Sequence, residues 1–153
     1  MTEPRAERSA ASLLARVDAS WSDFRPLLGE LREGHLDRSV AGGWTVRHVL
    51  AHLVAWHDDA ATRLAQFHAT GAMTPQPDVD PFNEQVAARA GDTSLPRLVT
   101  DLERSFRRLR DETARLRDGQ LLMGDGWAAT EIAANTWEHY EDHVADLRVE
   151  RAG

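Results

Sequence analysis

The sequence contains no cysteine and no lysine among its 153 residues. Without cysteine, the chain has no disulfide, no thiolate ligand for a metal and no thiol nucleophile of its own. Any metal site must therefore be built from histidine, aspartate or glutamate side chains. Without lysine, catalysis through a Schiff base is excluded. The chain does contain seven histidines, which are the most informative residues in it.

Long apolar runs are also missing. The longest, residues 49–56, is interrupted by a histidine and is far too short to span a bilayer. Residues 1–12 are charged and lack the apolar core of a signal peptide. We therefore expect a cytoplasmic protein that has no membrane partner.

Basic residues are also comparatively few. Acidic residues outnumber basic ones by 25 to 18, and the formal net charge is -7. A nucleic-acid-binding protein needs a basic face that displaces counterions from phosphates, so we expect no nucleic-acid partner. The length and the 42% hydrophobic content suit a single domain over residues 1–153 with a sizeable core.

The hydrophobic pattern is helical, and the alternation typical of strands is nearly absent. Thr45 is a suitable N-cap, and Pro96 suits the first turn of a helix. Pro26 lies inside an apolar stripe and predicts a kink or a break there. Apolar residues recur every three or four positions in four segments, which we predict to be helices: residues 5–33, 45–70, 94–118 and 128–149.

A long connector that contains three prolines separates the second and third predicted helices, over residues 71–93. Residues 82–89 within it can form a short helix. A linker of this length in a compact domain is typical of a crossover or of a functional loop. We therefore predict an all-α protein, a four-helix bundle in which a crossover joins helices two and three.

Two parts of the chain resemble each other at an offset of 85 residues. Leu31-Arg-Glu-Gly-His-Leu36 matches Leu116-Arg-Asp-Gly-Gln-Leu121, and a Gly-Trp pair follows each run before the next helix. The apolar positions of the preceding helices correspond at the same offset. We interpret the chain as two similar helical hairpins, which agrees with a bundle of four helices.

His139 and His143 are four residues apart, so both project from one face of the predicted fourth helix. Both also lie on its apolar stripe, where imidazoles are costly unless they are hydrogen-bonded or bind a ligand. An i, i+4 pair offers two ligands to a divalent metal. The pair therefore indicates either hydrogen-bonded core histidines or part of a metal site.

A third ligand would have to come from another helix, and the second predicted helix offers two candidates. On a helical wheel His57 lies near the centre of the apolar face and His52 at its edge, which favours His57. A helix rises about 1.5 Å per residue, so His52 lies at the same depth in the bundle as His139 and His143 if helices two and four are antiparallel. His57 matches if they are parallel. The long connector allows helices two and three to be parallel, which makes two and four antiparallel, so we prefer His52 and keep His57 as the alternate ligand.

Two stretches of the sequence resemble the DinB-like superfamily of metalloenzymes. They are Gly-Gly-Trp44-Thr-Val-Arg-His-Val-Leu-Ala-His52-Leu-Val-Ala-Trp56 and, far downstream, Thr136-Trp-Glu-His139-Tyr-Glu-Asp-His143. This group includes the mycothiol-dependent maleylpyruvate isomerases, the bacillithiol S-transferases and the colibactin self-resistance proteins. The resemblance covers essentially the whole chain.

The resemblance implies a four-helix bundle with a crossover between helices two and three. It also implies a metal site formed by one histidine of helix two and the His-x-x-x-His of helix four. Carried over, these ligands are His52, His139 and His143, while His57 occupies a position where relatives often carry glutamate. The metals implied are divalent, with zinc or nickel foremost, and the resemblance together with the commonness of two-fold assemblies favours a homodimer.

Three neutral imidazoles leave a metal position open, and such a site lowers the pKa of a bound water or thiol. The sequence therefore predicts a metal-dependent enzyme that acts on a small electrophilic molecule. It would be a hydrolase, or a transferase or isomerase that uses a low-molecular-weight thiol. The alternatives are a bundle that binds a toxic compound without turnover and a dimeric scaffold with a vestigial metal site.

Three further residues are candidates for contact with the ligands. Glu138 and Asp142 neighbour the ligands in the sequence, but they point toward the flank of the helix, which also fits solvated surface charges. Tyr140 is the only tyrosine and lies beside the stripe, which also fits a core aromatic whose hydroxyl is hydrogen-bonded. The sequence identifies no catalytic residue and no binding residues for a thiol.

Overall fold

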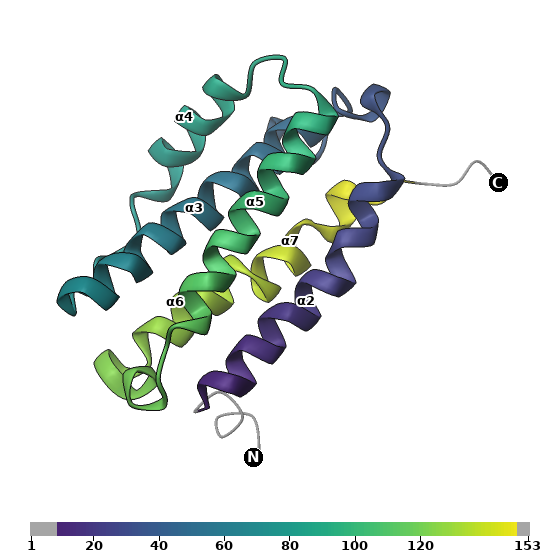
Figure 1. Ribbon diagram of the computed structural model, residues 1–153. Coiled ribbons are helices and arrows are strands. Elements are labelled where there is room, and N and C mark those ends of the chain that lie inside the picture. The colour runs from purple at the N-terminus through teal and green to yellow at the C-terminus, as the bar shows by residue number, and fades with distance from the viewer. Residues whose placement is uncertain (1–8, 150–153) are drawn as a thin grey trace.

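The computed structural model describes residues 9–149 and is all-helical over that range (Figure 1). The prediction of an all-α protein is therefore confirmed. No helix within the described range combines the length and the apolar composition needed to cross a bilayer. Between residues 9 and 149, three short 3-10 segments accompany the α-helices, whose bounds are α2 Ala10–Glu30, α3 Val46–Thr70, α4 Val79–Ala90, α5 Leu95–Ala114, α6 Trp127–Asn135 and α7 Trp137–Leu147.

The first predicted helix is present, and of the kink or break predicted at Pro26 the break does not occur. Helix α2 runs continuously past this residue. Pro26 is exposed, and so is Ser22, whose carbonyl lacks the usual N–H partner. Water can satisfy that carbonyl, so the proline does not end the helix. The predicted start of the segment, residues 5–8, lies outside the described residues.

The prediction of one continuous helix over residues 128–149, in contrast, is wrong. The helix is interrupted at Thr136, whose φ of -124° and ψ of -105° are not helical, and this residue separates α6 from α7. The Thr136 hydroxyl donates a 2.7 Å hydrogen bond to the carbonyl of Ile132. Side-chain hydroxyls that bind a carbonyl four residues back compete with the backbone ladder, which bends or interrupts helices.

The connector is a crossover, as its length predicts. It contains α4 and returns the chain along α3 to the start of α5 (Figure 1). Hydrogen bonds from the start, middle and end of α3 reach, in the same order, the residues just before α5, its middle and its end, which makes these helices parallel: Arg47 to Thr93, His57 to Ser105 and His68 to Glu112.

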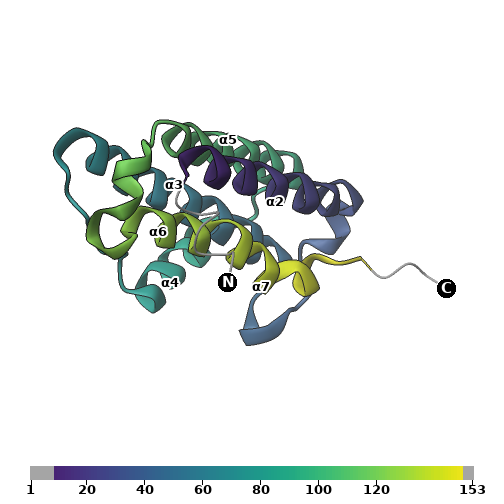
Figure 2. The same cartoon turned by 90° about the horizontal axis from the view of Figure 1, so that it is seen from below.

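Helix α3 is antiparallel to the α6–α7 segment. Near its start it contacts α7, through His52 and His139, and further along it contacts α6, through Arg63 and Glu131. Figure 2 shows the same arrangement from below, with α2 and α5 on one side and α4, α6 and α7 on the other side of the view. This direction places the early turns of α3 beside α7, where the histidine pair lies.

The two similar six-residue runs adopt the same local structure. Each forms a 3-10 turn in which a side chain accepts a hydrogen bond from a backbone N–H three residues earlier: His35 Nδ1 from Arg32 N in the first run, and Gln120 Oε1 from Arg117 N in the second. The leucines at both ends of each run are buried. The internal resemblance is therefore structural as well as sequential.

Buried apolar side chains form two clusters, and Trp21 of α2 packs against both. Its ring stacks on Phe106 with centroids 4.3 Å apart and meets the edge of His57. Burial of apolar surface of this extent is the main force that holds the helices together. It fixes α3 against α7, and so the depth at which their histidines meet.

Helix α3 begins where the sequence predicts, with Thr45 as its N-cap. The Thr45 side chain accepts a hydrogen bond from His48 N, and His48 Nδ1 accepts one from Thr45 N. Each bond satisfies a backbone N–H that the helix leaves without a partner. This cap sets the start of the helix that carries His52.

We predict that Thr45→Ala lowers the free energy of unfolding by about 1 kcal/mol, because one capping bond of α3 is lost. Urea unfolding followed by circular dichroism measures the change. Thr100→Ala is the matched control, since Thr100 is exposed in α5 and its replacement is expected to change stability by less than about 0.5 kcal/mol. Equal losses in the two variants would contradict the capping role.

Candidate metal centre

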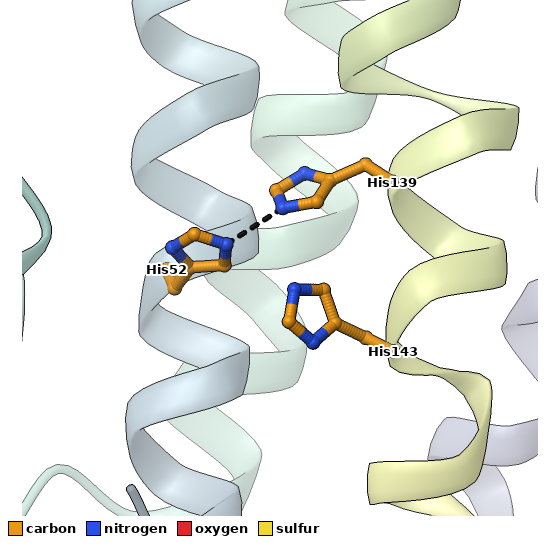
Figure 3. A group of neighbouring side chains, drawn as sticks. All are labelled: His52, His139 and His143. Atoms are coloured by element: carbon orange, nitrogen blue, oxygen red, sulfur yellow. Dashed lines mark hydrogen bonds between the residues drawn. The ribbon is translucent and has the colours of Figure 1, made fainter. Parts of the chain in front are cut away.

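Three histidine rings from two helices converge on one point inside the fold (Figure 3). His52 comes from α3, and His139 and His143 come from successive turns of α7. Each ring offers a nitrogen that lies within 4.8 Å of the nitrogens offered by the other two. The ring centroids are 4.6 to 5.0 Å apart. The structure thus brings together the three histidines that the sequence analysis preferred.

The contact between His52 and His139 is the shortest in the group, with 2.6 Å between their Nε2 atoms. At this distance either one nitrogen carries a proton and donates it to the other, or a cation lies between their two lone pairs. The donors of the group therefore face one another, as ligands of a single ion do.

Burial lowers the pKa of two of these histidines. Loss of hydration, with the charge of His143 second, lowers the pKa of His52 to about 4. Loss of hydration and the neighbouring histidines lower the pKa of His139 to about 2. Both rings are therefore neutral at pH 7, and neutral imidazole is the form that ligates metals.

The outer nitrogens of the rings have different surroundings. Asp146 Oδ2 lies 3.0 Å from His143 Nδ1. An ionised carboxylate only accepts hydrogen bonds, so His143 Nδ1 donates and Nε2 is the nitrogen that faces the other two rings. Asn83 Oδ1 lies 3.0 Å from His52 Nδ1. The Nδ1 atom of His139 is buried without a hydrogen-bond partner.

These residues fit a divalent metal ion. Three imidazole nitrogens are a common donor set for zinc and also suit nickel, and they leave a coordination position open. A carboxylate behind one ligating imidazole is the usual arrangement in such sites. Burial of His139 Nδ1 without a hydrogen-bond partner has a free-energy cost for the folded protein. Ligation through Nε2 would offset that cost.

His57, the alternate ligand, does not join the group. It is fully buried, its Nδ1 lies 2.9 Å from Ser105 Oγ, and its Nε2 lies 2.8 Å from the Tyr140 hydroxyl. Burial lowers the pKa of His57 to about 3 and raises the pKa of Tyr140 well above its ordinary value. Both nitrogens of His57 are thus satisfied by side chains. His57 and Tyr140 tie α3 to α7 behind the three histidines.

The acid that contacts this group of histidines is neither of the two acids proposed from the sequence. Glu138 and Asp142 are both exposed. Asp146 contacts His143 instead, and its position three residues after His143 is a helical spacing that could have identified it. Asn83 was also missed. It lies on the predicted short helix, but no spacing in the sequence relates it to His52.

Comparison with known protein families gives a match over most of the chain. A family model described as the mycothiol maleylpyruvate isomerase N-terminal domain matches residues 17–148, nearly the whole chain. This range includes all three histidines of the group. No curated protein and no solved structure shows a significant match.

Proposed function

Because the chain belongs to the mycothiol maleylpyruvate isomerase N-terminal domain family, we propose that it is a divalent-metal-dependent enzyme. The reaction is the transfer of a low-molecular-weight thiol to a small electrophilic molecule, or the thiol-dependent isomerisation of that molecule. The observation that carries the proposal is the convergence of His52, His139 and His143. The four long helical segments, with α6 and α7 taken as one interrupted helix, support a four-helix bundle with a crossover as the scaffold.

The metal, for which we propose zinc or nickel, would be held by the three imidazoles. A divalent ion supplies Lewis acidity, which lowers the pKa of a thiol or water bound to it. The chain itself supplies three imidazole rings at fixed positions, two on successive turns of α7 and one on α3. Asp146 orients the His143 ring through its Nδ1.

The reacting sulfur must come from a small molecule because the sequence contains no cysteine. A thiolate adds to an electrophilic alkene carbon, which forms a carbon–sulfur bond and moves an electron pair toward the activating carbonyl. Isomerisation follows if the molecule rotates about the new single bond and expels the same thiolate. Transfer results if a proton is taken up and the carbon–sulfur bond remains. The thiol is therefore regenerated in the first reaction and consumed in the second.

Aromatic side chains form the wall of the site around His52. The ring of Trp44 meets the edge of the His52 ring with centroids 5.0 Å apart, and Trp56 does so at 6.4 Å. Indole rings beside the ligand keep water away from it and so strengthen electrostatic interactions in the site. An uncharged, planar electrophile suits such a wall better than a strongly hydrated one.

Metal analysis and a turnover assay test the proposal together. The purified protein is expected to bind about one equivalent of Zn²⁺ or Ni²⁺ and to gain melting temperature on its addition. It is then incubated with an electrophilic alkene and mycothiol or bacillithiol, and both the alkene and the free thiol are followed. Metal-dependent loss of the alkene is expected, with or without consumption of the thiol.

Three outcomes would count against the proposal. Turnover without any thiol would favour a hydrolase, and binding of the electrophile without product would favour sequestration. A protein that binds no divalent ion and gains no melting temperature from one would contradict the metal-dependent function altogether.

A further inference from the structure

We propose that Asn83 is a positioning residue whose amide oxygen holds His52 in the tautomer that carries its proton on Nδ1, so that the lone pair on Nε2 faces His139 and His143. The inference deepens the proposed function, because it assigns a role to a side chain outside the three ligands. It concerns a property of the metal-free protein, and it can therefore be tested independently of any activity.

The side chain of Asn83 makes two hydrogen bonds through the same atom. Its Oδ1 lies 3.0 Å from His52 Nδ1 and 2.8 Å from Trp56 Nε1. An indole N–H only donates, so the atom that faces it must be the amide oxygen and not the amide nitrogen. That oxygen only accepts. The partner nitrogen on His52 must therefore carry the proton.

The consequence lies on the other side of the His52 ring. In a neutral imidazole only one nitrogen carries a proton, so Nε2 is left with its lone pair. This atom lies 2.6 Å from His139 Nε2, inside the group of three. The opposite tautomer would place a hydrogen on Nε2, where no metal could bind, and would leave Asn83 Oδ1 facing a lone pair. Trp56 excludes the opposite tautomer by fixing which end of the amide points inward.

Asn83 reaches His52 from a separate element. It lies on α4, 31 residues further along the chain. The preceding residue, Phe82, packs its ring on Trp56 with centroids 4.4 Å apart, which anchors this turn of α4 to α3. The crossover therefore does more than connect α3 to α5, because it carries the side chain that orients one of the three histidines.

The three histidines differ in the side chain that orients each ring. Asp146 orients His143, and it lies on the same helix three residues away. His139 has no partner at Nδ1. His52 is thus the one ligand of the group that is oriented by a side chain from the crossover. Loss of that side chain should affect His52 without altering the two ligands on α7.

The tautomer of His52 can be measured directly in the metal-free wild-type protein. Long-range proton–nitrogen correlation spectra distinguish a protonated from an unprotonated ring nitrogen. We expect the His52 Nδ1 signal of a protonated nitrogen and the Nε2 signal of an unprotonated one. A wild-type spectrum with the proton on Nε2 would overturn the inference, whatever any variant does.

Variants of Asn83 then test the consequence for metal binding, with Zn²⁺ alone as the probe. Asn83→Leu has a similar shape but no acceptor, and we expect it to weaken Zn²⁺ binding roughly 10- to 100-fold. Asn83→Asp keeps an acceptor toward both Nδ1 and the indole, and we expect it to restore affinity to within about threefold of the wild type, well inside the range expected for loss of the partner. Glu84→Leu, at the exposed neighbouring position of α4, is the matched control and should bind as the wild type does.

The outcomes separate this inference from the proposed function. Wild-type protein that binds no Zn²⁺, Ni²⁺ or Co²⁺ would defeat the proposed function, while the tautomer spectrum would still decide the role of Asn83. Strong Zn²⁺ binding by both the wild type and Asn83→Leu would overturn the positioning role and leave the metal site intact. Failure of Asn83→Asp to restore binding would also count against it, since a residue needed only for packing gives no reason for rescue by an acceptor.

Discussion

Replacing His139 with alanine is expected to abolish stoichiometric binding of zinc or nickel and, with it, the metal-dependent gain in stability. His139 has the shortest contact in the group, 2.6 Å from His52, and its Nδ1 is buried without a partner. One of three ligands is lost, and the remaining two lie on different helices. An ion present at 100 to 1,000 times its dissociation constant stabilises the wild type by roughly 2.7 to 4.1 kcal/mol, and the variant should lose nearly all of this.

Elemental analysis after dialysis and thermal unfolding with and without Zn²⁺ measure the two effects. His48→Ala is the matched control because His48 lies on α3 one turn before His52 and takes part in the helix cap, outside the group of three. It should lose some stability with and without metal alike and keep its full metal content. A His139→Ala protein that still carries one equivalent of metal would contradict the assignment of this ligand.

Acid is expected to unfold the metal-free protein between about pH 6 and pH 4, and the reason is a set of buried neutral histidines. The pKa values of His52, His57 and His139 are lowered from 6.5 to about 4, 3 and 2. In each case loss of hydration is the main cause. None of these rings takes up a proton in the folded state until the pH falls well below 6.5.

The direction follows from proton binding in the two states. Below pH 6.5 the unfolded chain protonates these histidines, whereas the folded protein does not until the pH reaches about 4 or less. The unfolded state therefore binds more protons, so stability falls as the pH falls. Each histidine contributes about 1.4 kcal/mol per pH unit, and three together would remove about 4 kcal/mol per unit. A domain stable by 5–15 kcal/mol cannot withstand this loss over many units.

Urea unfolding at a series of pH values between 4.5 and 8, with a chelator present, measures the slope. His57→Gln removes one buried imidazole and keeps an amide that can bond Ser105 or Tyr140. It should reduce the slope by about one histidine's share, roughly 1.4 kcal/mol per pH unit. A wild-type protein whose stability is constant from pH 7 to pH 4.5 would refute the explanation, and an unchanged slope in His57→Gln would refute the part assigned to His57.

The choice between His52 and His57 shows what periodicity alone can decide. The helical wheel placed His57 at the centre of the apolar face, and the structure buries it fully. Its position there lets Ser105 and Tyr140 satisfy both of its nitrogens. The functional candidate is the histidine at the edge of the face. It was identified by its depth along the helix and by the length of the connector, which predicted that α3 and α7 would be antiparallel.

Other features could not be obtained from the sequence. Thr136 looks compatible with a continuous helix, and the interruption there depends on a hydroxyl that binds a carbonyl within the packed structure. Asn83 is an ordinary polar residue of a short helix until α4 packs on α3. The exposed positions of Glu138 and Asp142, in contrast, agree with the flank of the helix to which the sequence assigned them.

The amino-acid sequence by itself determined which chemistry is available and which residues share a helix face. The lack of cysteine removes thiolate ligands, and the shared face of His139 and His143 follows from 3.6 residues per turn. The sequence favoured His52 over His57 as the third histidine, and the packing of α3 against α7 brings His52 beside the pair. Only the packing of α4 on α3 decided which side chain fixes the proton of His52. The physical reason is that helix periodicity is local, whereas contacts between helices depend on the side chains that pack between them.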